Sequence, residues 1–449
     1  MMHRDLSIID ILKFASENHS LSEVVSLRTE GDMHRYNYTD CLSRVCKLAN
    51  ALVGLGIKKG DRVATLAWNG YRHLELYYGI SGIGAVCHTI NPRLSPEQML
   101  YIIEHAGDRL LFVDTTFVPI IEKLIPKLPK NLVIIVMASS DDSSTLSDNF
   151  LNYEQLILES SHDIIWPELP ENTAAGLCYT SGTTGNPKGA LYSHRSTVLH
   201  ALTTSLNLGP SLGDGMKVLP VVPLFHVNAW GLPYAAPLTG TSLIFPGPNL
   251  DGASLFDLMD QENVNSAWGV PTVWLGLLEE IRKQERVPSQ FQNVVIGGSA
   301  APKSMIEEFE SLGITVCHAW GMTEMSPVGT QGFLPGSMKK ALSQDEQISK
   351  KCYQGRRVFG VDLKIVDEND NSLPHDGIAS GELYVRGNAI ISGYYKNNEA
   401  TEEAFDKEGW FGTGDIASIT TDGFLNIQDR AKDLIKSGGE WISSIDIEN

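Results

Sequence analysis

The sequence predicts an α/β protein with two layered α/β subdomains and a small β subdomain. Helix and strand patterns alternate over most of the chain, and short strand patterns follow one another toward its C-terminal end. At 449 residues the chain exceeds the usual size of a single hydrophobic core. More than one domain is therefore expected.

The alternation begins in the first 140 residues. Apolar residues repeat at helical spacing after Thr39, which is expected to cap a helix, and Asp61–Trp68 has the pattern of a strand. Ser95–Gln98 has the sequence of a capping box with proline at the first helical position, and it predicts a helix that runs toward Gly107. The strand-like residues Leu110–Val113 follow. Such βα alternation favours a mainly parallel sheet.

The same alternation returns after a polar stretch, Ser139–Asn149, that is expected to form a surface loop. A buried strand is predicted over Val294–Gly298 and a helix over Pro302–Leu312. Farther on, Leu363–Val366 and Glu382–Val385 alternate apolar and polar residues between glycines. That pattern is typical of antiparallel strands and predicts the small β subdomain.

Composition narrows the functional classes. The net charge of −19 argues against nonspecific nucleic-acid binding and against adhesion to anionic lipid. The six cysteines form no C-x-x-C pair, which favours reduced thiols in a cytoplasmic protein. The most apolar region, Val218–Pro248, is interrupted by prolines, so buried strands and loops are expected there and no transmembrane segment.

The most informative segment is Tyr179–Gly189, which combines glycines, hydroxyl residues and Lys188 after an apolar stretch. Glycines allow backbone N–H groups to converge on an anion, and a lysine supplies a point charge for phosphate oxygens. The spacing differs from that of the Walker loop, so a P-loop NTPase is a weak alternative. Taken alone, such a segment is more often an ordinary surface turn.

Four further motifs follow this segment: Trp320–Glu324, Gly412–Asp415, Asp429–Asp433 and Lys436–Ile442. Together and in this order, the five motifs resemble those of the acyl-adenylating superfamily of acyl-CoA synthetases, beetle luciferases and peptide synthetase adenylation domains. The resemblance implies a large N-terminal domain that ends in a small β-barrel subdomain, then the start of an α+β C-terminal domain. The expected divisions are 1–172, 173–335, 336–430 and 431–449.

The resemblance also implies the reaction and its nucleotide site. A carboxylic acid would be joined to ATP with Mg²⁺ and transferred from acyl-AMP to coenzyme A. Trp320 would stack on adenine, although a structural tryptophan is an alternative, and Asp415 would bind the ribose hydroxyls. The full expected nucleotide set is Thr180, Ser181, Gly182, Thr183, Thr184, Gly185, Lys188, Gly298, His318, Ala319, Trp320, Gly321, Met322, Thr323, Asp415, Ile427, Arg430, Lys432 and Lys436.

The remaining assignments also come from the resemblance. Thr180 and Glu324 would hold the metal, because both offer oxygen ligands to a hard cation. The expected catalytic set is Thr180, Lys188, His226 and Glu324, and the expected acid-binding set is His226, Val227, Trp230, Gly298 and Trp441. His226 and Trp230 would border the acyl tunnel, with a core histidine beside a core tryptophan as the alternative. For Lys432 and Lys436, solvated surface positions are the alternative.

Within the superfamily the patterns are most similar to medium- and long-chain fatty acyl-CoA synthetases and methylmercaptopropionate-CoA ligases. An aliphatic acid is the expected substrate and a homodimer is possible. An acyl-AMP or aryl acid ligase, or a noncatalytic nucleotide- and acyl-binding module, are the alternatives. The family usually continues for about a hundred residues beyond Asn449 and places a catalytic lysine there, so poor turnover is expected of this chain.

Overall fold

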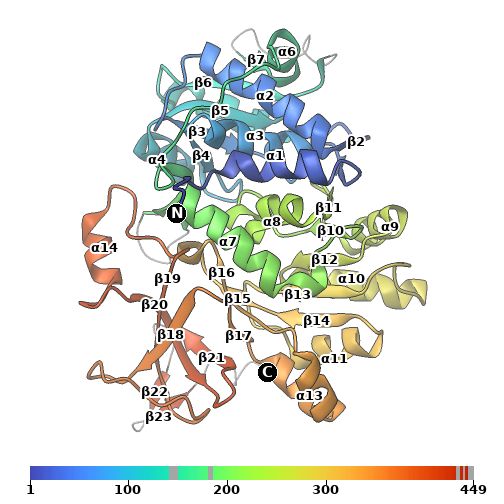
Figure 1. The fold of residues 1–449 in the computed structure, drawn as a ribbon, viewed down its shortest axis with the longest axis vertical. Coiled ribbons are helices and arrows are strands. Elements are labelled where there is room, and N and C mark those ends of the chain that lie inside the picture. The colour runs from blue at the N-terminus through green and yellow to red at the C-terminus, as the bar shows by residue number, and fades with distance from the viewer. Residues whose placement is uncertain (141–149, 181–185, 431–434, 438–439, 443–449) are drawn as a thin grey trace.

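The computed structural model describes residues 1–140, 150–180, 186–430, 435–437 and 440–442, with the backbone alone from residue 430 onward (Figure 1). Two seven-stranded sheets, each covered by helices, form the larger part of the chain, and antiparallel strands follow them. This arrangement confirms the predicted α/β class with a β subdomain. No helix in the described ranges is both long and apolar enough to span a membrane.

The first sheet has the order β7-β6-β5-β3-β4-β8-β9 and is parallel except for the pair β8–β9. Its strands are β3 (Arg62–Leu66), β4 (Val86–Thr89), β5 (Asp108–Asp114), β6 (Val133–Met137), β7 (Leu151–Asn152), β8 (Ala174–Thr180) and β9 (Lys188–Ser193). Its helices are α2 (Tyr38–Gly54), α3 (Tyr71–Gly82), α4 (Pro96–Ala106), α5 (Val118–Leu124) and α6 (Tyr153–Glu159).

The second sheet has the order β14-β13-β12-β10-β11-β1-β2, and only β2 runs antiparallel to its neighbour. The strands are β1 (Glu23–Leu27), β2 (Met33–Asn37), β10 (Lys217–Pro220), β11 (Ser242–Phe245), β12 (Ser266–Gly269), β13 (Asn293–Ile296) and β14 (Thr315–His318). The helices are α1 (Ile8–Asn18), α7 (His194–Asn207), α8 (Leu232–Thr239), α9 (Gly252–Glu262), α10 (Pro271–Gln284), α11 (Lys303–Ser311), α12 (Gly336–Ala341) and α13 (Gln344–Cys352).

The β subdomain contains two antiparallel sheets, β15-β16-β17 and β18-β19-β20-β21. They are connected at one edge, where Leu425 exchanges backbone hydrogen bonds with Gln354 and Gly355. The described strands therefore form a pair of bonded sheets where a small barrel was expected. Bounds are β15 (Trp320–Gly321), β16 (Val328–Gln331), β17 (Arg356–Arg357), β18 (Val361–Val366), β19 (Ser380–Gly387), β20 (Phe411–Ile419), β21 (Leu425–Arg430) and α14 (Asn398–Ala404), followed by the hairpin β22 (Ile435–Ser437) and β23 (Glu440–Ile442).

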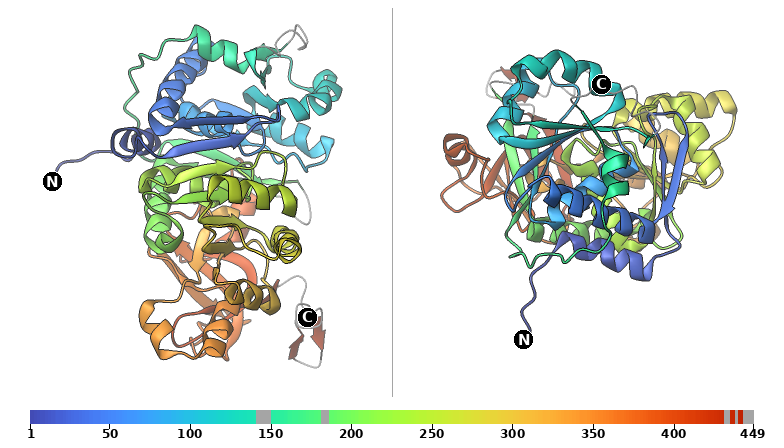
Figure 2. Two further views of the ribbon diagram at one scale, coloured as in Figure 1. Left: turned by 90° about the vertical axis from the view of Figure 1, so that its right-hand side faces the viewer. Right: turned by 90° about the horizontal axis from the view of Figure 1, so that it is seen from above.

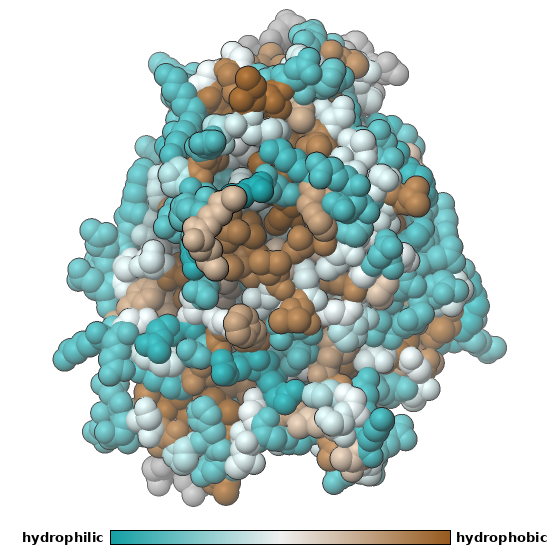
Figure 3. All heavy atoms as spheres, in the orientation of Figure 1, coloured by the Kyte–Doolittle hydropathy of each residue, from teal (hydrophilic) through white to brown (hydrophobic). Residues whose placement is uncertain are grey.

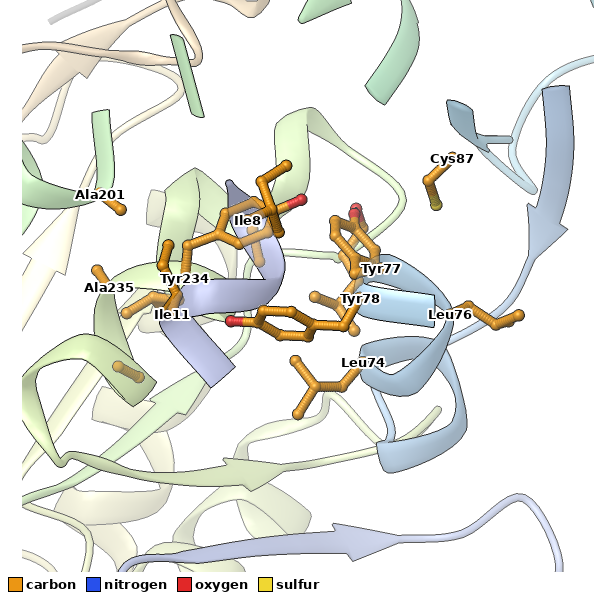
Figure 4. Close-up of a cluster of buried hydrophobic side chains, with 14 of the residues drawn as sticks. Ile8, Ile11, Leu74, Leu76, Tyr77, Tyr78, Cys87, Ala201, Tyr234 and Ala235 are labelled. Atoms are coloured by element: carbon orange, nitrogen blue, oxygen red, sulfur yellow. The ribbon is translucent and has the colours of Figure 1, made fainter. Parts of the chain in front are cut away.

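The hydrophobic core continues from one large sheet to the other. Side chains of α1, α3 and α8 meet there, and Figure 4 shows Ile8, Ile11, Tyr78 and Tyr234 among them. The left view of Figure 2 shows the first sheet above the second, with the β subdomain below. Burial of this shared apolar surface is the main favourable term that fixes the two units against each other.

Three expectations about local structure need correction. The cap of α2 is Asn37, whose side chain accepts a 2.9 Å hydrogen bond from Asp40 N, and Thr39 lies inside the helix. The apolar region Val218–Pro248 contains a helix, α8, because its prolines occupy the first turn and one tolerated interior position. The division at residue 172 does not separate the sheets, since β1 and β2 join the second sheet and β8 and β9 the first.

Candidate active site

The phosphate-loop candidate lies between two paired strands. Thr180 ends β8 and faces Lys188, the first residue of β9, and Thr180 Oγ1 donates a 3.4 Å hydrogen bond to the Lys188 carbonyl. The strand pair therefore holds both ends of the loop at one edge of the first sheet. The loop residues expected to grip phosphate, Ser181, Gly182, Thr183, Thr184 and Gly185, lie outside the described residues.

Glu324 lies in a short turn after β15 and is 6% exposed. The Tyr394 hydroxyl donates a 2.7 Å hydrogen bond to Glu324 Oε1, and the Tyr394 ring lies 5.2 Å from Lys188 Nζ. Burial, and then the negative charge of Glu324, raises the pKa of Tyr394 well above its usual value. The tyrosine is therefore a neutral donor that connects the carboxylate with the loop lysine.

Sequence reasoning missed Tyr394. The residue follows Gly393 in the connection between β19 and α14, where an exposed turn would be an ordinary expectation. An isolated antiparallel bridge to Ala190 and the backbone bond from Tyr395 N to Gly189 O, 2.8 Å long, bring it against β9. Because this contact joins segments about two hundred residues apart, no local pattern could have indicated it.

The expected metal residues come from neighbouring segments. The Tyr192 hydroxyl on β9 donates a 2.7 Å hydrogen bond to the Thr323 carbonyl, which draws the turn containing Glu324 toward the strand pair that begins at Thr180. A hydroxyl and a carboxylate are both hard oxygen donors. The two residues present thus fit a magnesium ion that is held mainly through phosphate oxygens.

The expected nucleotide residues Trp320 and Asp415 are in contact. Trp320 Nε1 on β15 donates a 3.2 Å hydrogen bond to Asp415 Oδ2 on β20, and Asp415 is 4% exposed. The backbone of Arg430 pairs with Asp415 across β20 and β21. Ile427 on β21 donates its N–H to Gln354 Oε1 over 2.7 Å. The motifs are far apart in sequence, and the β subdomain brings them to one place.

His318 ends the strand β14 next to this region, and Ala319 follows it. His318 Nε2 accepts a 3.3 Å hydrogen bond from Ala301 N, and Nδ1 lies 3.2 Å from the Cys352 carbonyl. Burial lowers the pKa of His318 to about 4, so the ring is neutral and both nitrogens have backbone partners. Because both ring nitrogens are engaged, the His318 side chain can contact a nucleotide only through the face of its ring. Its Nε2 anchors the turn at Ala301.

The residues from Gly321 to Thr323 form a tight turn against the strand that follows. A Cβ at Gly321 would lie 2.0 Å from the Pro327 carbonyl oxygen, so only glycine fits. Met322 donates its N–H to that same oxygen over 3.2 Å. This close approach of two backbone segments sets the direction in which Glu324 leaves the turn.

The acid-binding candidates lie on an unusual backbone segment. Val227, Asn228, Ala229 and Trp230 have φ angles of 41°, 57°, 45° and 57°, followed by Gly231 at 83°. We call Val227–Gly231 the left-handed turn. This conformation costs roughly 1–2 kcal/mol for each residue that has a Cβ. Such strain persists only where the surrounding structure holds it, and it clusters at functional sites.

The left-handed turn meets the glycine turn of the second sheet. A Cβ at Gly297 would lie 3.1 Å from Trp230 Cη2 and 3.0 Å from the Ala319 carbonyl oxygen, and Gly298 has a φ of 80°. Trp230 is 8% exposed. The tryptophan thus closes the space between the expected acid residues and the expected nucleotide residues, which explains why small residues are needed opposite it.

His226 precedes the left-handed turn and has an exposed side chain. Its pKa is lowered, first because surrounding protein displaces water and then by the positive charge of Arg93. The ring is therefore open to solvent and lies close to the positive charge of Arg93. Lys432 lies outside the described residues, and the side chains of Arg430, Lys436 and Trp441 are not described, so their expected roles remain predictions.

The chain is similar to known proteins over its whole length. The profile of the family described as AMP-binding enzyme matches residues 14–395, so the chain belongs to this family. It is 48% identical to a medium-chain-fatty-acid–CoA ligase of Ectopseudomonas oleovorans over all of this chain and 82% of that protein. It is 46% identical to a 3-methylmercaptopropionyl-CoA ligase of Ruegeria lacuscaerulensis over all of this chain and 83% of that protein.

Among solved structures, the anthranilate CoA ligase AuaEII in complex with anthranoyl-AMP has a TM-score of 0.86 at 22% identity, covering all of this chain and 82% of that one. That likeness supports the fold alone. With the family and the curated relatives, the protein is an acyl-adenylating enzyme. More specifically, it is an AMP-forming acid–thiol ligase, which uses ATP, Mg²⁺ and coenzyme A.

Proposed function

We propose that the acid this ligase activates is a fatty acid or a related aliphatic carboxylic acid. The observation that carries this proposal is the junction at Trp230, where a buried aromatic side chain packs on Gly297 and Gly298 beside His226. Arg93 makes the surroundings of His226 electropositive. Such surroundings suit a carboxylate and disfavour the ammonium group of an amino acid. Apolar walls favour an aliphatic chain.

The described residues support one division of roles. Lys188 at the end of the phosphate loop neutralises phosphate charge, while Thr180 and Glu324 hold Mg²⁺, which when bound supplies further charge neutralisation to the phosphates. Trp320 provides a face for adenine and Asp415 accepts from the ribose hydroxyls. His226 and Trp230 orient the acid carboxylate toward the α-phosphate. The barrier is mostly charge repulsion, so positioning and neutralisation are the main contributions.

The test is AMP formation from ATP with short, medium, long and aryl acids, with and without coenzyme A. In parallel, the binding of N-acylsulfamoyl adenosines, stable mimics of acyl-AMP, is measured across the same acids. The proposal predicts one aliphatic length that is preferred in both measurements. A preference for the aryl acid would favour the aryl acid ligase, and release of pyrophosphate with accumulation of acyl-AMP that coenzyme A does not consume would favour the acyl-AMP ligase. The first result would overturn the proposed substrate class, and the second would contradict the transfer of the acyl group to coenzyme A.

Two coarser properties are also proposed. All six cysteines are free thiols, three on helices and three on strands of the two large sheets, which supports a reducing, cytoplasmic location. A homodimer is supported by hydrophobic side chains exposed on the face that carries α1 and α7 (Figure 3), among them Phe14, Leu202 and Leu206. Sedimentation equilibrium of the purified protein decides between monomer and dimer.

A further inference from the structure

The segment that leads to the left-handed turn is bound by a side chain of the other large subdomain. Asn69, which precedes α3, is 4% exposed. Its Nδ2 donates to the carbonyls of Pro220 and Val222 over 2.7 and 2.9 Å, and its Oδ1 accepts from Leu224 N over 2.6 Å. Both donor hydrogens and the acceptor of the amide are therefore used on one stretch of backbone.

A second side chain of α3 reaches the turn itself. The hydroxyl of Tyr77, a residue that is 1% exposed, donates a 2.5 Å hydrogen bond to the Leu224 carbonyl and lies 3.2 Å from Asn228 Oδ1. Asn228 is the second residue of the left-handed turn. In Figure 4 the hydroxyls of Tyr77 and its neighbour Tyr78 point in different directions from α3.

A third side chain supports the far end of the turn. His200 on α7 accepts a 3.0 Å hydrogen bond from Val328 N at its Nε2. Its ring fills the space that a Cβ at Gly231 would need, with Cε1 only 2.7 Å from that position. Val328 follows the segment that carries Glu324. His200 thus links the end of the left-handed turn with the segment of the expected metal ligand.

We propose that Asn69, Tyr77 and His200 are positioning residues for acid binding, which hold His226 and Trp230 in place through the strained backbone between them. A run of four non-glycine residues in the left-handed region does not persist without such support. Each of the three side chains hydrogen-bonds or contacts either the left-handed turn or the segment that leads to it. None of them belongs to the expected substrate-binding set. This inference rests on the proposed role of His226 and Trp230 in binding the acid.

The sharpest test compares Tyr77→Phe with Tyr78→Phe. Both tyrosines are buried on α3, and the Tyr78 hydroxyl donates a 2.6 Å hydrogen bond to the carbonyl of Pro233 in α8. Each substitution removes one buried hydroxyl that bonds a backbone carbonyl, and Tyr77→Phe also removes the contact with Asn228 Oδ1, so both variants should lose thermal stability of the same order. Only Tyr77→Phe releases the approach to the left-handed turn.

The readout is the ratio of two affinities measured by calorimetry, one for octanoylsulfamoyl adenosine and one for AMP. We expect Tyr77→Phe to weaken binding of the acyl compound about fivefold, the effect of one net hydrogen bond, with AMP binding unchanged. Tyr78→Phe should change neither affinity. Equal weakening in both variants, or none in Tyr77→Phe, would overturn the inference.

The wild-type protein separates this inference from the function on which it rests. If wild-type protein binds the acyl compound no more tightly than AMP, the proposed acid site itself is wrong. If wild-type protein shows the acyl preference and Tyr77→Phe retains it in full, the acid site stands and the positioning role fails. His200→Gln provides a second variant, because glutamine retains an acceptor for Val328 N while leaving Gly231 without the ring behind it.

Discussion

The Tyr394 hydroxyl donates its hydrogen bond to Glu324, and the same ring lies under the Lys188 ammonium. A tyrosine from the connection before α14 therefore touches both the expected metal ligand and the expected phosphate lysine. The raised pKa of Tyr394 keeps the hydroxyl protonated at neutral pH. An ammonium over an aromatic face adds a modest attraction, about 0.5–2 kcal/mol.

Tyr394→Phe should reduce adenylation while leaving the ring beneath Lys188. The lost hydrogen bond has a charged acceptor, which corresponds to about tenfold or more in kcat/KM for ATP, since such bonds contribute roughly 1.5–3 kcal/mol. Loss of orientation at Glu324 should also raise the Mg²⁺ concentration needed for half-maximal rate. Initial rates of AMP formation over a magnesium series measure both effects.

The neighbouring residue supplies the matched control. The Tyr395 hydroxyl donates a weaker 3.3 Å hydrogen bond to the Ala106 carbonyl and has no hydrogen bond to an expected site residue among those that the structure describes. Tyr395→Phe should retain the wild-type magnesium dependence. If the two variants respond to magnesium alike, Tyr394 has a purely structural role.

Asp415→Asn should weaken AMP binding about tenfold, because a neutral amide replaces a charged acceptor for the ribose hydroxyls. The asparagine carbonyl oxygen still accepts from Trp320 Nε1, so the contact between β15 and β20 is retained. Trp320→Phe keeps an aromatic face and should lose less affinity than Trp320→Ala. Calorimetric titration with AMP measures all three variants, and equal losses in the two Trp320 variants would exclude stacking.

Local patterns predicted the elements that local interactions determine. The capping box at Ser95 is confirmed, with Ser95 Oγ accepting from Gln98 N and Gly107 ending α4 in the left-handed region. The sequence prediction placed the cap of α2 two residues too late. Asn37 and Thr39 are both good N-cap residues by type, and only the backbone conformation at Asn37 distinguishes them. The pairing of β1 with β11 joins residues far apart in sequence, which no periodicity reveals.

In the candidate site, too, contacts between residues far apart in sequence could not be predicted from local patterns. Motif resemblance indicated Trp320 and Asp415, and the structure brings them together, although their roles stay predictions. Asn69 and Tyr77 were missed because their partners lie about 150 residues farther along the chain. The left-handed turn could not be predicted from the residue types, because valine, alanine and tryptophan all disfavour positive φ. Tertiary contacts override that preference here, so the residue types at these positions predicted the wrong backbone conformation.

Mild acid should destabilise the fold. His73, His200 and His318 are almost completely buried, and burial lowers their pKa values to about 4, about 3 and about 4. An unfolded histidine has a pKa of about 6.5, so below that pH the unfolded chain binds more protons. These histidines therefore leave the free energy of unfolding undiminished above about pH 6.5. As the pH drops from there toward 4, the free energy of unfolding falls by about 1.4 kcal/mol per pH unit for each histidine.

Two carboxyl groups act in the opposite direction, since burial raises the pKa of Asp114 to about 7 and also raises the pKa of Asp108, and the folded state then holds their protons more tightly than the unfolded chain does. His34 and His194 also have pKa values lowered to about 4, so five histidines against two aspartic acids leave a net loss. Urea unfolding at pH 7.5 and pH 5.5 measures it, and His73→Gln should reduce the difference by about one histidine's share. A free energy of unfolding that is constant or rises between these pH values would contradict the prediction.

Substitutions at two glycines with positive φ distinguish the cost of backbone strain from the cost of a steric contact. Gly231 has a φ of 83° and lies against the His200 ring, whereas Gly215 has a φ of 77° and open space around it. Gly215→Ala should cost about 1–2 kcal/mol of stability through strain alone. Gly231→Ala should cost a further 1–3 kcal/mol or so, because the added methyl group must displace His200. Urea unfolding gives both values, and binding of octanoylsulfamoyl adenosine should weaken in Gly231→Ala alone. Equal costs and unchanged binding would show that His200 does not support the left-handed turn.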